Sequence, residues 1–250
     1  MGTYNQSKQL SHFKMRRKLS VVIISKNEEL FIAEAINSAN FADEVVVVDS
    51  GSTDKTCSIA KELGAKVYNQ KWLGYGAQKN YAIQKTKNEW VFVLDADERI
   101  TNELKEEIKA TLLSPKFHVY KIARLNNFFG KNIKYCGLYP DYSIRFFKKG
   151  SGKFNIVPVH ESFQTKKEVG TLVNYMKHNA FNSISEFRKK QLNYANLSCK
   201  KPNIFKAFIS PIWIFLKIFI FRLGFLEGWR GFLIAIIYSE YTYRKYSERK

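Results

Sequence analysis

The chain has 250 residues, which is enough for one sizeable core or for one domain with an appendage. A hydrophobic content of 45% and a charged content of 25% are typical of a globular protein and exclude an intrinsically disordered chain. The net charge of +19 predicts an anionic partner, which can be a nucleic acid, a membrane surface or a phosphorylated substrate.

The cysteines and the N-terminal segment favour a reducing compartment. Cys57, Cys136 and Cys199 are widely spaced and form no CxxC pair, so neither a zinc site nor a disulfide framework is expected. Basic residues precede the apolar run 19–25, but this run is short and no small-residue cleavage pattern follows it. We therefore expect a first core strand rather than a signal peptide, and a cytoplasmic protein.

Strand and helix signals alternate from residue 19 to residue 113. Continuous runs rich in β-branched residues predict strands over 19–25, 44–49, 65–68 and 90–95. Helical spacing predicts helices over 28–39, 53–63 and 76–85. Thr101 is expected to cap a further helix that ends near Leu113. This alternation predicts an α/β fold with a mostly parallel sheet flanked by helices, where ligands bind at the carboxyl ends of the strands.

The middle of the chain has strand signals over 118–126, 143–147 and 169–175. Ser183, with Glu186 three residues later, forms a capping-box pattern that predicts a helix through Tyr194. Residues 19–200 are therefore expected to form one α/β domain, which follows a basic segment over 1–18.

The last segment, 201–250, has a different composition. Phe, Ile, Leu and Trp are frequent over 204–238, but charged residues interrupt them, so no uncharged run approaches the roughly 20 residues of a membrane span. Pro211 and three nearby glycines break the segment into pieces: Gly224, Gly228 and Gly231. Basic residues among aromatic ones favour an amphipathic helical extension that lies in an anionic membrane interface. The alternative is a helical pair that packs on the domain or in a dimer.

The acidic element Asp95-Ala96-Asp97 directly follows the apolar run of the predicted fourth strand. Its side chains would leave the sheet at the edge where a ligand binds. Two carboxylates in this spacing can share a cation, and Mg²⁺ or Mn²⁺ prefers carboxylate oxygens together with phosphate oxygens of a substrate. Such a metal would neutralise charge on a diphosphate leaving group. An acidic pair can also be a solvated turn, but its position after a buried strand favours the metal site.

Two further polar elements follow predicted strands. The segment 49–54 (DSGSTD) places a carboxylate at a strand end, before a helix whose N-terminus favours anions. Ordinary turn chemistry explains the Gly and Ser of this segment but not Asp49. The segment 25–28 (SKNE) follows the first strand, where a dinucleotide-binding fold would need G-x-G-x-x-G. That motif and the P-loop motif are missing, which argues against NAD, FAD and P-loop chemistry.

Several motifs recur in a recognisable order: Asn27-Glu28 after a strand, then "VVVVDSGSTDKT", "GYGAQKNYAI" and "WVFVLDADE". With them the chain resembles the family 2 glycosyltransferases, which have the GT-A fold, from about Leu19 to Arg99. The later stretch "YPDYSIRFF", followed by "VHESF" and a lysine-rich helix, is similar to the lipopolysaccharide-core glucosyltransferase subfamily that includes the heptose β-1,4-glucosyltransferase.

The resemblance implies roles for individual residues. The residues expected to bind the nucleotide sugar are Asn27, Glu28, Asp49, Ser52, Asp54, Lys79 and Asp95. Within this set Asn27 and Asp49 would frame the nucleobase, usually uracil, and Asp95 would lie near the ribose. Asp97 would ligate the metal, with Asp95 as its partner in the motif. Lys79 would lie near the diphosphate, although lysine is also a common surface residue.

An inverting transfer also needs a base that deprotonates the acceptor hydroxyl as its oxygen attacks the anomeric carbon opposite the nucleotide. Many family members have a Glu-Asp pair for this role, and this sequence lacks it. Glu161 is the favoured candidate, because it follows a predicted strand by a loop, and Asp141 is the alternative. Either carboxylate could instead be a loop residue that pairs with Arg145.

Two histidines and a set of aromatic residues have open roles. His160 and His178 could each supply a third metal contact or an acceptor contact, but a lone histidine is more often structural. Aromatic residues of the middle segment could stack on sugar faces, although core packing is the more common role of such residues. They are Phe128, Phe129, Tyr135, Tyr139 and Tyr142.

These observations predict an inverting, metal-dependent transfer of glucose or another hexose from a nucleotide sugar, such as a UDP-sugar. The expected acceptor is a lipid-linked or lipopolysaccharide-core saccharide at the inner face of the cytoplasmic membrane. One alternative is a nucleotidyltransferase acting on sugar phosphates, which usually needs a glycine-rich phosphate loop that is missing here. The other is a basic nucleic-acid-binding protein, but the basic residues are spread along the chain without a recognised motif.

Overall fold

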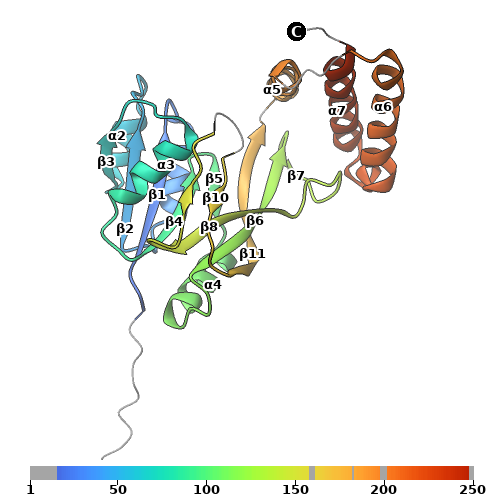
Figure 1. Cartoon of the computed structure of the whole chain (residues 1–250). Coiled ribbons are helices and arrows are strands. Elements are labelled where there is room, and N and C mark those ends of the chain that lie inside the picture. Colours follow the sequence, from blue (N-terminus) through green and yellow to red (C-terminus); the bar gives the residue numbers. More distant parts are fainter. Residues whose placement is uncertain (1–15, 158–160, 182, 198–201, 248–250) are drawn as a thin grey trace, which may run out of the picture.

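The computed structural model describes residues 16–157, 161–181, 183–197 and 202–247 (Figure 1). A central sheet is flanked by helices, and the helices of the last part of the chain form a separate group beside it. The α/β fold class expected from the alternation of strand and helix signals is confirmed.

The first half of the sheet is parallel, with the strand order β3-β2-β1-β4. Its strands are β1 (Leu19–Ser25), β2 (Glu44–Asp49), β3 (Lys66–Asn69) and β4 (Trp90–Asp95). The connecting helices are α1 (Ile32–Ser38), α2 (Thr56–Glu62) and α3 (Tyr75–Gln84). Ser25 of β1 lies beside Asp49, and Ile24 lies beside Asp95, so both aspartates reach the same edge of the sheet.

The second half of the sheet contains both parallel and antiparallel pairs. The prediction of a mostly parallel sheet therefore holds only for the first half. β8 runs antiparallel to both β4 and β6, β11 is parallel to β6, and β5 is antiparallel to β11. These strands are β5 (Glu98–Ile100), β6 (Val119–Phe128), β8 (Asp141–Lys148) and β11 (Val169–Phe181). The chain returns from β6 to β8 without a crossover helix, and such a return gives antiparallel pairing.

Short elements complete this half. β7 (Lys131–Asn132) pairs with the end of β6, and β9 (Lys153–Phe154) pairs with β10 (Phe163–Gln164) in a separate ribbon. α4 (Asn102–Leu113) begins after Thr101, whose Oγ1 accepts the N–H of Leu104 at 3.2 Å, as its predicted capping role requires.

The core consists of one apolar cluster on each face of the sheet. Successive residues of β1 alternate between the clusters: Val21 and Ile23 belong to one, Val22 and Ile24 to the other. Every residue of β1 is buried, which explains why its sequence is a continuous apolar run rather than an alternating one.

After β11 the described chain is helical. α5 (Ile184–Leu197) comes first, and the helical extension follows with α6 (Ile204–Leu216), the π-helical turn η1 (Lys217–Phe221), the 3-10 turn η2 (Gly224–Glu227) and α7 (Trp229–Ser247). Ser183 caps α5 by accepting the N–H of Glu186 at 3.2 Å, as predicted. A third apolar cluster joins the extension to the sheet, because Phe128 of β6 and Phe181 of β11 pack there with Phe187, Ile234 and Ile237.

Candidate active site

A cleft of about 950 Å³ opens where β1 and β4 end. Charged and histidine side chains from several elements line it: Lys26, Glu28, Lys79, Asp95, Asp97, Arg124, Arg145, Glu161, His178 and Lys190. Aromatic side chains also line it: Trp72, Tyr75, Tyr142, Phe154, Phe163 and Tyr194. The cleft therefore lies at the strand ends where open α/β sheets bind ligands, and it combines cations with carboxylates.

The loops after β1 and β2 are bonded to each other at one side of the cleft. Asn27 has a positive φ of 55°, and its side-chain oxygen accepts the N–H of Thr53 at 2.9 Å. Its own N–H donates to Ser52 Oγ at 2.8 Å, and the N–H of Glu29 donates to Asp54 at 3.1 Å. These contacts delay the first helix, expected from residue 28, until Ile32. Asn27, Ser52 and Asp54 thus hold together a rim from which Glu28, and none of these three residues, lines the cleft.

Asp49 lies behind this rim and does not line the cleft. Its side chain accepts the N–H groups of Gly51 and Ser52 at 2.9 and 2.8 Å and the hydroxyl of Ser25 at 3.1 Å. Burial acts to raise the pKa of Asp49, but the hydrogen bonds from Ser52 and Gly51 outweigh it and lower the pKa. Asp49 is therefore a permanent anion that holds the turn in shape.

Glu28 lines the cleft beside the Asp95-Ala96-Asp97 element. Its pKa is raised to about 7 by burial and by the nearby carboxylates of Asp97 and Asp54. A carboxyl group with this pKa exchanges its proton near neutral pH, and a bound cation would favour its ionised form.

Asp95 is held by two cations. Its carboxylate lies 2.8 Å from the guanidinium of Arg145 and 3.0 Å from Nζ of Lys79. Burial acts to raise the pKa of Asp95, but Arg145 and Lys79 outweigh it and hold the pKa well below its ordinary value. Because both carboxylate oxygens already face cations of the protein, Asp95 is less suited than Asp97 to bind a metal directly.

Lys79 joins Asp95 to Glu161. Its side chain is 2% exposed, and Nζ lies 2.7 Å from Oε1 of Glu161, which also lines the cleft. The lysine comes from α3, which packs beneath the cleft, so it is a buried part of the site rather than a surface residue. Glu161 therefore faces the cleft with the ammonium group of Lys79 at its side.

Asp141 occupies a different place from Glu161. It begins β8 and pairs with Arg124 at 2.6 Å. The suggestion that Asp141 or Glu161 pairs with Arg145 is wrong, because Glu161 pairs with Lys79 and Arg145 pairs with Asp95 and Glu98. Glu161 lines the cleft and Asp141 does not, so the geometry favours Glu161 among the two candidate bases.

Arg145 and Glu98 are site residues that the sequence analysis missed in this role. Glu98 is completely buried, lies 2.7 Å from Arg145 and accepts the N–H of Asp95 at 3.0 Å. In the sequence, Arg145 lies inside the apolar run of β8, and Glu98 is a third acid directly after the Asp95-Ala96-Asp97 element. Because buried charges are seldom left unpaired, these two residues could have been predicted to form an ion pair.

Asp97 faces His178, which lies on the part of β11 beyond the predicted strand end. Nε2 of His178 lies 3.2 Å from Oδ2 of Asp97, and Nδ1 lies 2.7 Å from Oδ1 of Asn126. The amide nitrogen of Asn126 donates to the carbonyl of Leu138 at 3.4 Å, which orients its oxygen toward His178. With the amide in this orientation Nδ1 donates to Asn126, so Nε2, when it carries no proton, presents its lone pair to a carboxylate oxygen of Asp97.

Two lone pairs at this separation repel each other unless a proton or a metal ion lies between them. A histidine that donates from Nδ1 to an amide oxygen has the arrangement common among metal-bound histidines. Within the described residues no group of three or more His, Cys, Asp or Glu side chains is arranged to hold a metal, so the described part of the chain offers only Asp97 and His178 as a facing pair. Asp97 and His178 therefore fit a metal that is completed by phosphate oxygens.

Other candidate residues have different positions. His160 lies outside the described residues. Tyr142 is the member of the aromatic set that lines the cleft, where Nζ of Lys121 lies 4.9 Å from its ring centre. Phe128 and Phe129 pack against Phe187, as core residues do.

Comparison with known proteins gives a consistent result. Residues 20–166 match the profile of Glycosyl transferase family 2. An uncharacterized glycosyltransferase of Rickettsia typhi is 36% identical over 243 residues, which cover 89% of this chain and 83% of the relative. The lipopolysaccharide core biosynthesis glycosyltransferase LpsC of Rhizobium meliloti is 28% identical over 241 residues, covering 90% and 89%. The solved structure of S. aureus TarS 1–349 is 18% identical, with a TM-score of 0.48 and coverage of 93% of each chain.

Proposed function

Because the chain belongs to glycosyl transferase family 2, we propose that its cleft moves a hexosyl group, with inversion, from a nucleotide sugar to a lipid-linked saccharide. Family membership makes the protein a glycosyltransferase with the α/β fold expected from the resemblance, and it displaces the nucleotidyltransferase and nucleic-acid-binding alternatives. The observation that carries the mechanistic proposal is the convergence of Asp97, His178 and Glu161 in one cleft.

The donor nucleotide, a UDP-sugar, lies against the rim formed by the loops after β1 and β2. Asn27 and Asp49 shape this rim, Ser52 and Asp54 hold its two loops together, and Glu28 faces the cleft from it. Asp95 lies near the ribose, fixed in place by Arg145 and Lys79. Lys79 is also proposed to lie near the diphosphate, since its Nζ lies between Asp95 and Glu161, which both line the cleft.

Asp97 and His178 would hold a Mg²⁺ or Mn²⁺ ion, and Asp95 would support Asp97 from the neighbouring position of the motif. When bound, the ion neutralises the charge that develops on the departing diphosphate. Asn126 keeps His178 in the tautomer that leaves Nε2 available, since Nδ1 donates to the amide oxygen at 2.7 Å.

Glu161 is the base, with Asp141 as the alternative. A carboxylate oxygen of Glu161 accepts the proton of the acceptor hydroxyl while the hydroxyl oxygen forms a bond to the anomeric carbon. The bond from this carbon to the nucleotide oxygen breaks on the opposite side, and the nucleotide leaves with the electron pair. Lys79, 2.7 Å from Glu161, holds the carboxylate in position for the transfer.

The acceptor saccharide is carried by a lipid, and the protein binds the inner face of the cytoplasmic membrane through the extension 201–250. The relative LpsC carries a name that places it in lipopolysaccharide core biosynthesis. The net charge of +19 attracts the protein to anionic lipid and to phosphorylated acceptors.

A donor panel tests the proposal. The purified full chain is incubated with UDP, GDP and dTDP hexoses, with and without Mn²⁺, and donor hydrolysis and the thermal midpoint are measured. We expect one donor class to raise the midpoint by mass action, more with Mn²⁺ than without it. Equal midpoints with every donor, together with no release of nucleotide, would contradict the proposed function.

A further inference from the structure

The helical extension exposes many large apolar side chains. On α6 and η1 they are Ile204, Phe205, Phe208, Ile209, Ile212, Trp213, Ile220 and Phe221. On the turn and α7 they are Leu223, Phe225, Leu226, Trp229, Phe232 and Ile236. We call these residues the apolar face. Contiguous apolar surface of this extent is rare on soluble monomers and marks an interaction site.

The charges around the apolar face indicate its partner. From residue 204 to residue 226 the sequence has no Asp or Glu, but it has Lys206, Lys217 and Arg222. Trp213 and Trp229 are each 54% exposed, and tryptophan is favoured at the boundary between lipid and water. A bilayer with anionic lipid fits both the apolar side chains and the one-sided charge.

Part of this face is apolar enough to cross a membrane. The stretch Ile204–Phe221 has 18 residues, a mean hydropathy of 2.0 and only 11% of its residues buried. By length and composition alone it qualifies as a span. At the rise of an α-helix it would measure about 27 Å, close to the roughly 30 Å of a hydrocarbon core.

The far end of α6 is tied to the sheet domain. Glu227, in the turn that follows, is buried and accepts the N–H groups of Lys134 and Tyr135 at 2.8 and 3.1 Å. It also pairs with Lys131 at 2.8 Å. The carbonyl of Arg222 accepts the N–H of Cys136 at 3.0 Å. These contacts join the turn to the connection between β6 and β8.

The near end of α6 is tied to the same body. The N–H of Asn203 donates to the carbonyl of Tyr246 at 3.0 Å, which closes the hairpin of α6 and α7. Arg188 of α5 pairs with Glu240 of α7 at 2.7 Å, and α5 follows directly from β11. Both ends of α6 are therefore fixed to one globular body.

From this we infer that α6 inserts parallel to the membrane plane, with the apolar face buried at the surface of one leaflet, and does not span the bilayer. A span would place one end of α6 on the far side and would carry the ion pair of Glu227 and Lys131 into hydrocarbon, where unpaired or buried charges are costly. An in-plane helix leaves both anchored ends on the cytoplasmic side.

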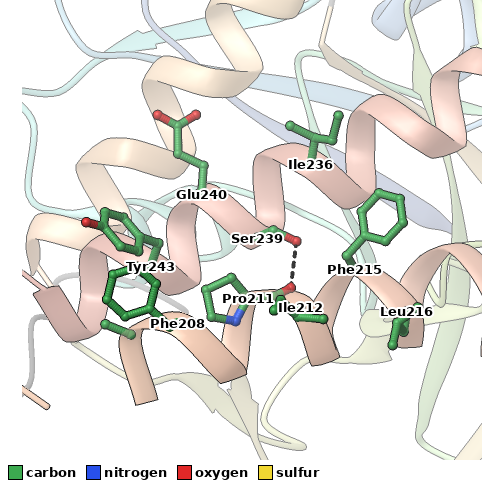
Figure 2. Close-up of a pocket in the computed structure, with 10 residues that line it drawn as sticks. Phe208, Pro211, Ile212, Phe215, Leu216, Ile236, Ser239, Glu240 and Tyr243 are labelled. Atoms are coloured by element: carbon green, nitrogen blue, oxygen red, sulfur yellow. Dashed lines mark hydrogen bonds between the residues drawn. The ribbon is translucent and has the colours of Figure 1, made fainter. Parts of the chain in front are cut away.

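A groove between α6 and α7 fits this arrangement (Figure 2). It has a volume of about 580 Å³ and is lined mainly by apolar side chains, among them Phe208, Ile212, Phe215 and Ile236. Figure 2 shows the hydroxyl of Ser239 donating to the carbonyl of Pro211, at 3.0 Å, across the groove floor. With the apolar face inserted, the groove is filled by lipid hydrocarbon chains.

The inference deepens the proposed function, on which its consequence for catalysis rests. Lys190 and Tyr194 of α5 line the cleft, while Arg188 of the same helix is bonded to α7. A hairpin held in the membrane plane therefore fixes the cleft at a set height above the surface. A saccharide attached to lipid in that leaflet would reach the side of the cleft formed by α5.

Vesicle binding tests the surface. The full chain is mixed with phosphatidylcholine vesicles that contain or lack phosphatidylglycerol, and bound protein is measured by cosedimentation. We expect binding to anionic vesicles, weakened by salt, and a loss of about tenfold or more for the double variant Phe208→Glu, Ile212→Glu. Leu113→Glu, an exposed apolar residue on α4, is the matched control and should bind as the wild type does. Circular dichroism and the thermal midpoint verify that each variant is folded.

Fluorescence quenching tests the orientation. In a Trp229→Phe background, Trp213 is the remaining tryptophan of the extension, near the middle of Ile204–Phe221. Lipids brominated near the headgroup should quench its vesicle-dependent signal more than lipids brominated near the chain ends. Stronger quenching at the chain ends would mean that α6 spans the bilayer and would overturn the inference.

Two further results separate the alternatives. A dimer in lipid-free solution that Ile212→Glu dissociates, with no vesicle binding by the wild type, would assign the apolar face to a second copy and overturn the inference. The vesicle assay contains neither donor nor acceptor, so it is independent of catalysis. Asp97→Asn should bind vesicles as the wild type does, and vesicle binding without sugar transfer would contradict only the proposed function.

Discussion

The cleft and the helical extension distribute charge and apolar surface in opposite ways. In the cleft, charged side chains are drawn into the protein and paired: Arg145 is 3% exposed, Lys79 is 2% exposed and Glu98 is fully buried. In the extension, large apolar side chains face outward, and Ile204 and Phe205 are 79% and 73% exposed. Buried charges are costly unless counter-charges lie beside them, as they do in the cleft. Exposed apolar side chains are costly in water unless another apolar surface covers them, and for the extension we infer that lipid does so.

The largest expected effect is the loss of one buried counter-charge. Arg145→Met removes the partner of both Asp95 and Glu98 and leaves a fully buried carboxylate without its closest cation. Breaking a buried pair from one side typically costs about 3–5 kcal/mol. We expect a decrease of that size in the free energy of unfolding, measured with urea. Arg188→Met, at an exposed arginine that also pairs with a glutamate, serves as the control and should change stability far less.

The next effect is a loss of activity without a loss of stability, expected for Asp97→Asn. Asp97→Asn keeps the size of the side chain but removes a negative charge beside His178. We expect sugar transfer to fall by about 10²–10³-fold, as when one stabilising group of a transition state is lost, and the effect of added Mn²⁺ on the thermal midpoint to disappear. Glu106→Gln, on the exposed surface of α4, is a control for the change of charge. A Mn²⁺ response equal to that of the wild type would contradict the role of Asp97.

Glu161→Gln and Asp141→Asn separate the two candidate bases. Because Glu161 lines the cleft and Asp141 does not, we expect Glu161→Gln to reduce kcat by about 10²–10⁴-fold with little change in the KM for the donor. Asp141→Asn should retain most of the kcat. The measurement is initial transfer rates over a range of donor concentrations. The reverse ranking of the two variants would assign the base to Asp141.

The sequence predicted the elements whose local signals were strong. Continuous apolar strands, the Thr101 cap and the Ser183 cap were correct, since each depends on neighbouring residues alone. The network of Arg145, Glu98 and Asp95 was not predicted, because its partners lie 47 and 50 residues apart in sequence and meet only when β8 pairs with β4. Metal ligation, the base and the nucleotide contacts of the cleft stay predictions.

A smaller effect is expected on the pH dependence of stability, through the ionisation of Glu28. Its pKa in the folded protein is about 7, above the ordinary value of 4.5, so the folded state keeps a proton that the unfolded state has already lost. This contribution to stability is present at acidic pH and is lost as pH rises through about 7. The Gln of Glu28→Gln is neutral at every pH. The urea midpoint of this variant should therefore decrease less from pH 5 to pH 8 than that of the wild type. An unchanged pH profile would show that Glu28 titrates normally.

The smallest expected effect completes the comparison between the two regions. Ile212 is 63% exposed on α6, so Ile212→Glu removes little buried surface and places a charge in water. Its free energy of unfolding in lipid-free solution should stay within about 0.5 kcal/mol of the wild type, as for most surface substitutions. Ile218, which is 6% exposed on η1, provides the contrast, because Ile218→Ala removes packing from the third apolar cluster and should cost about 2–5 kcal/mol. If Ile212→Glu were as destabilising as Ile218→Ala, the apolar face would be covered within the protein in solution, and lipid would not be needed to explain it.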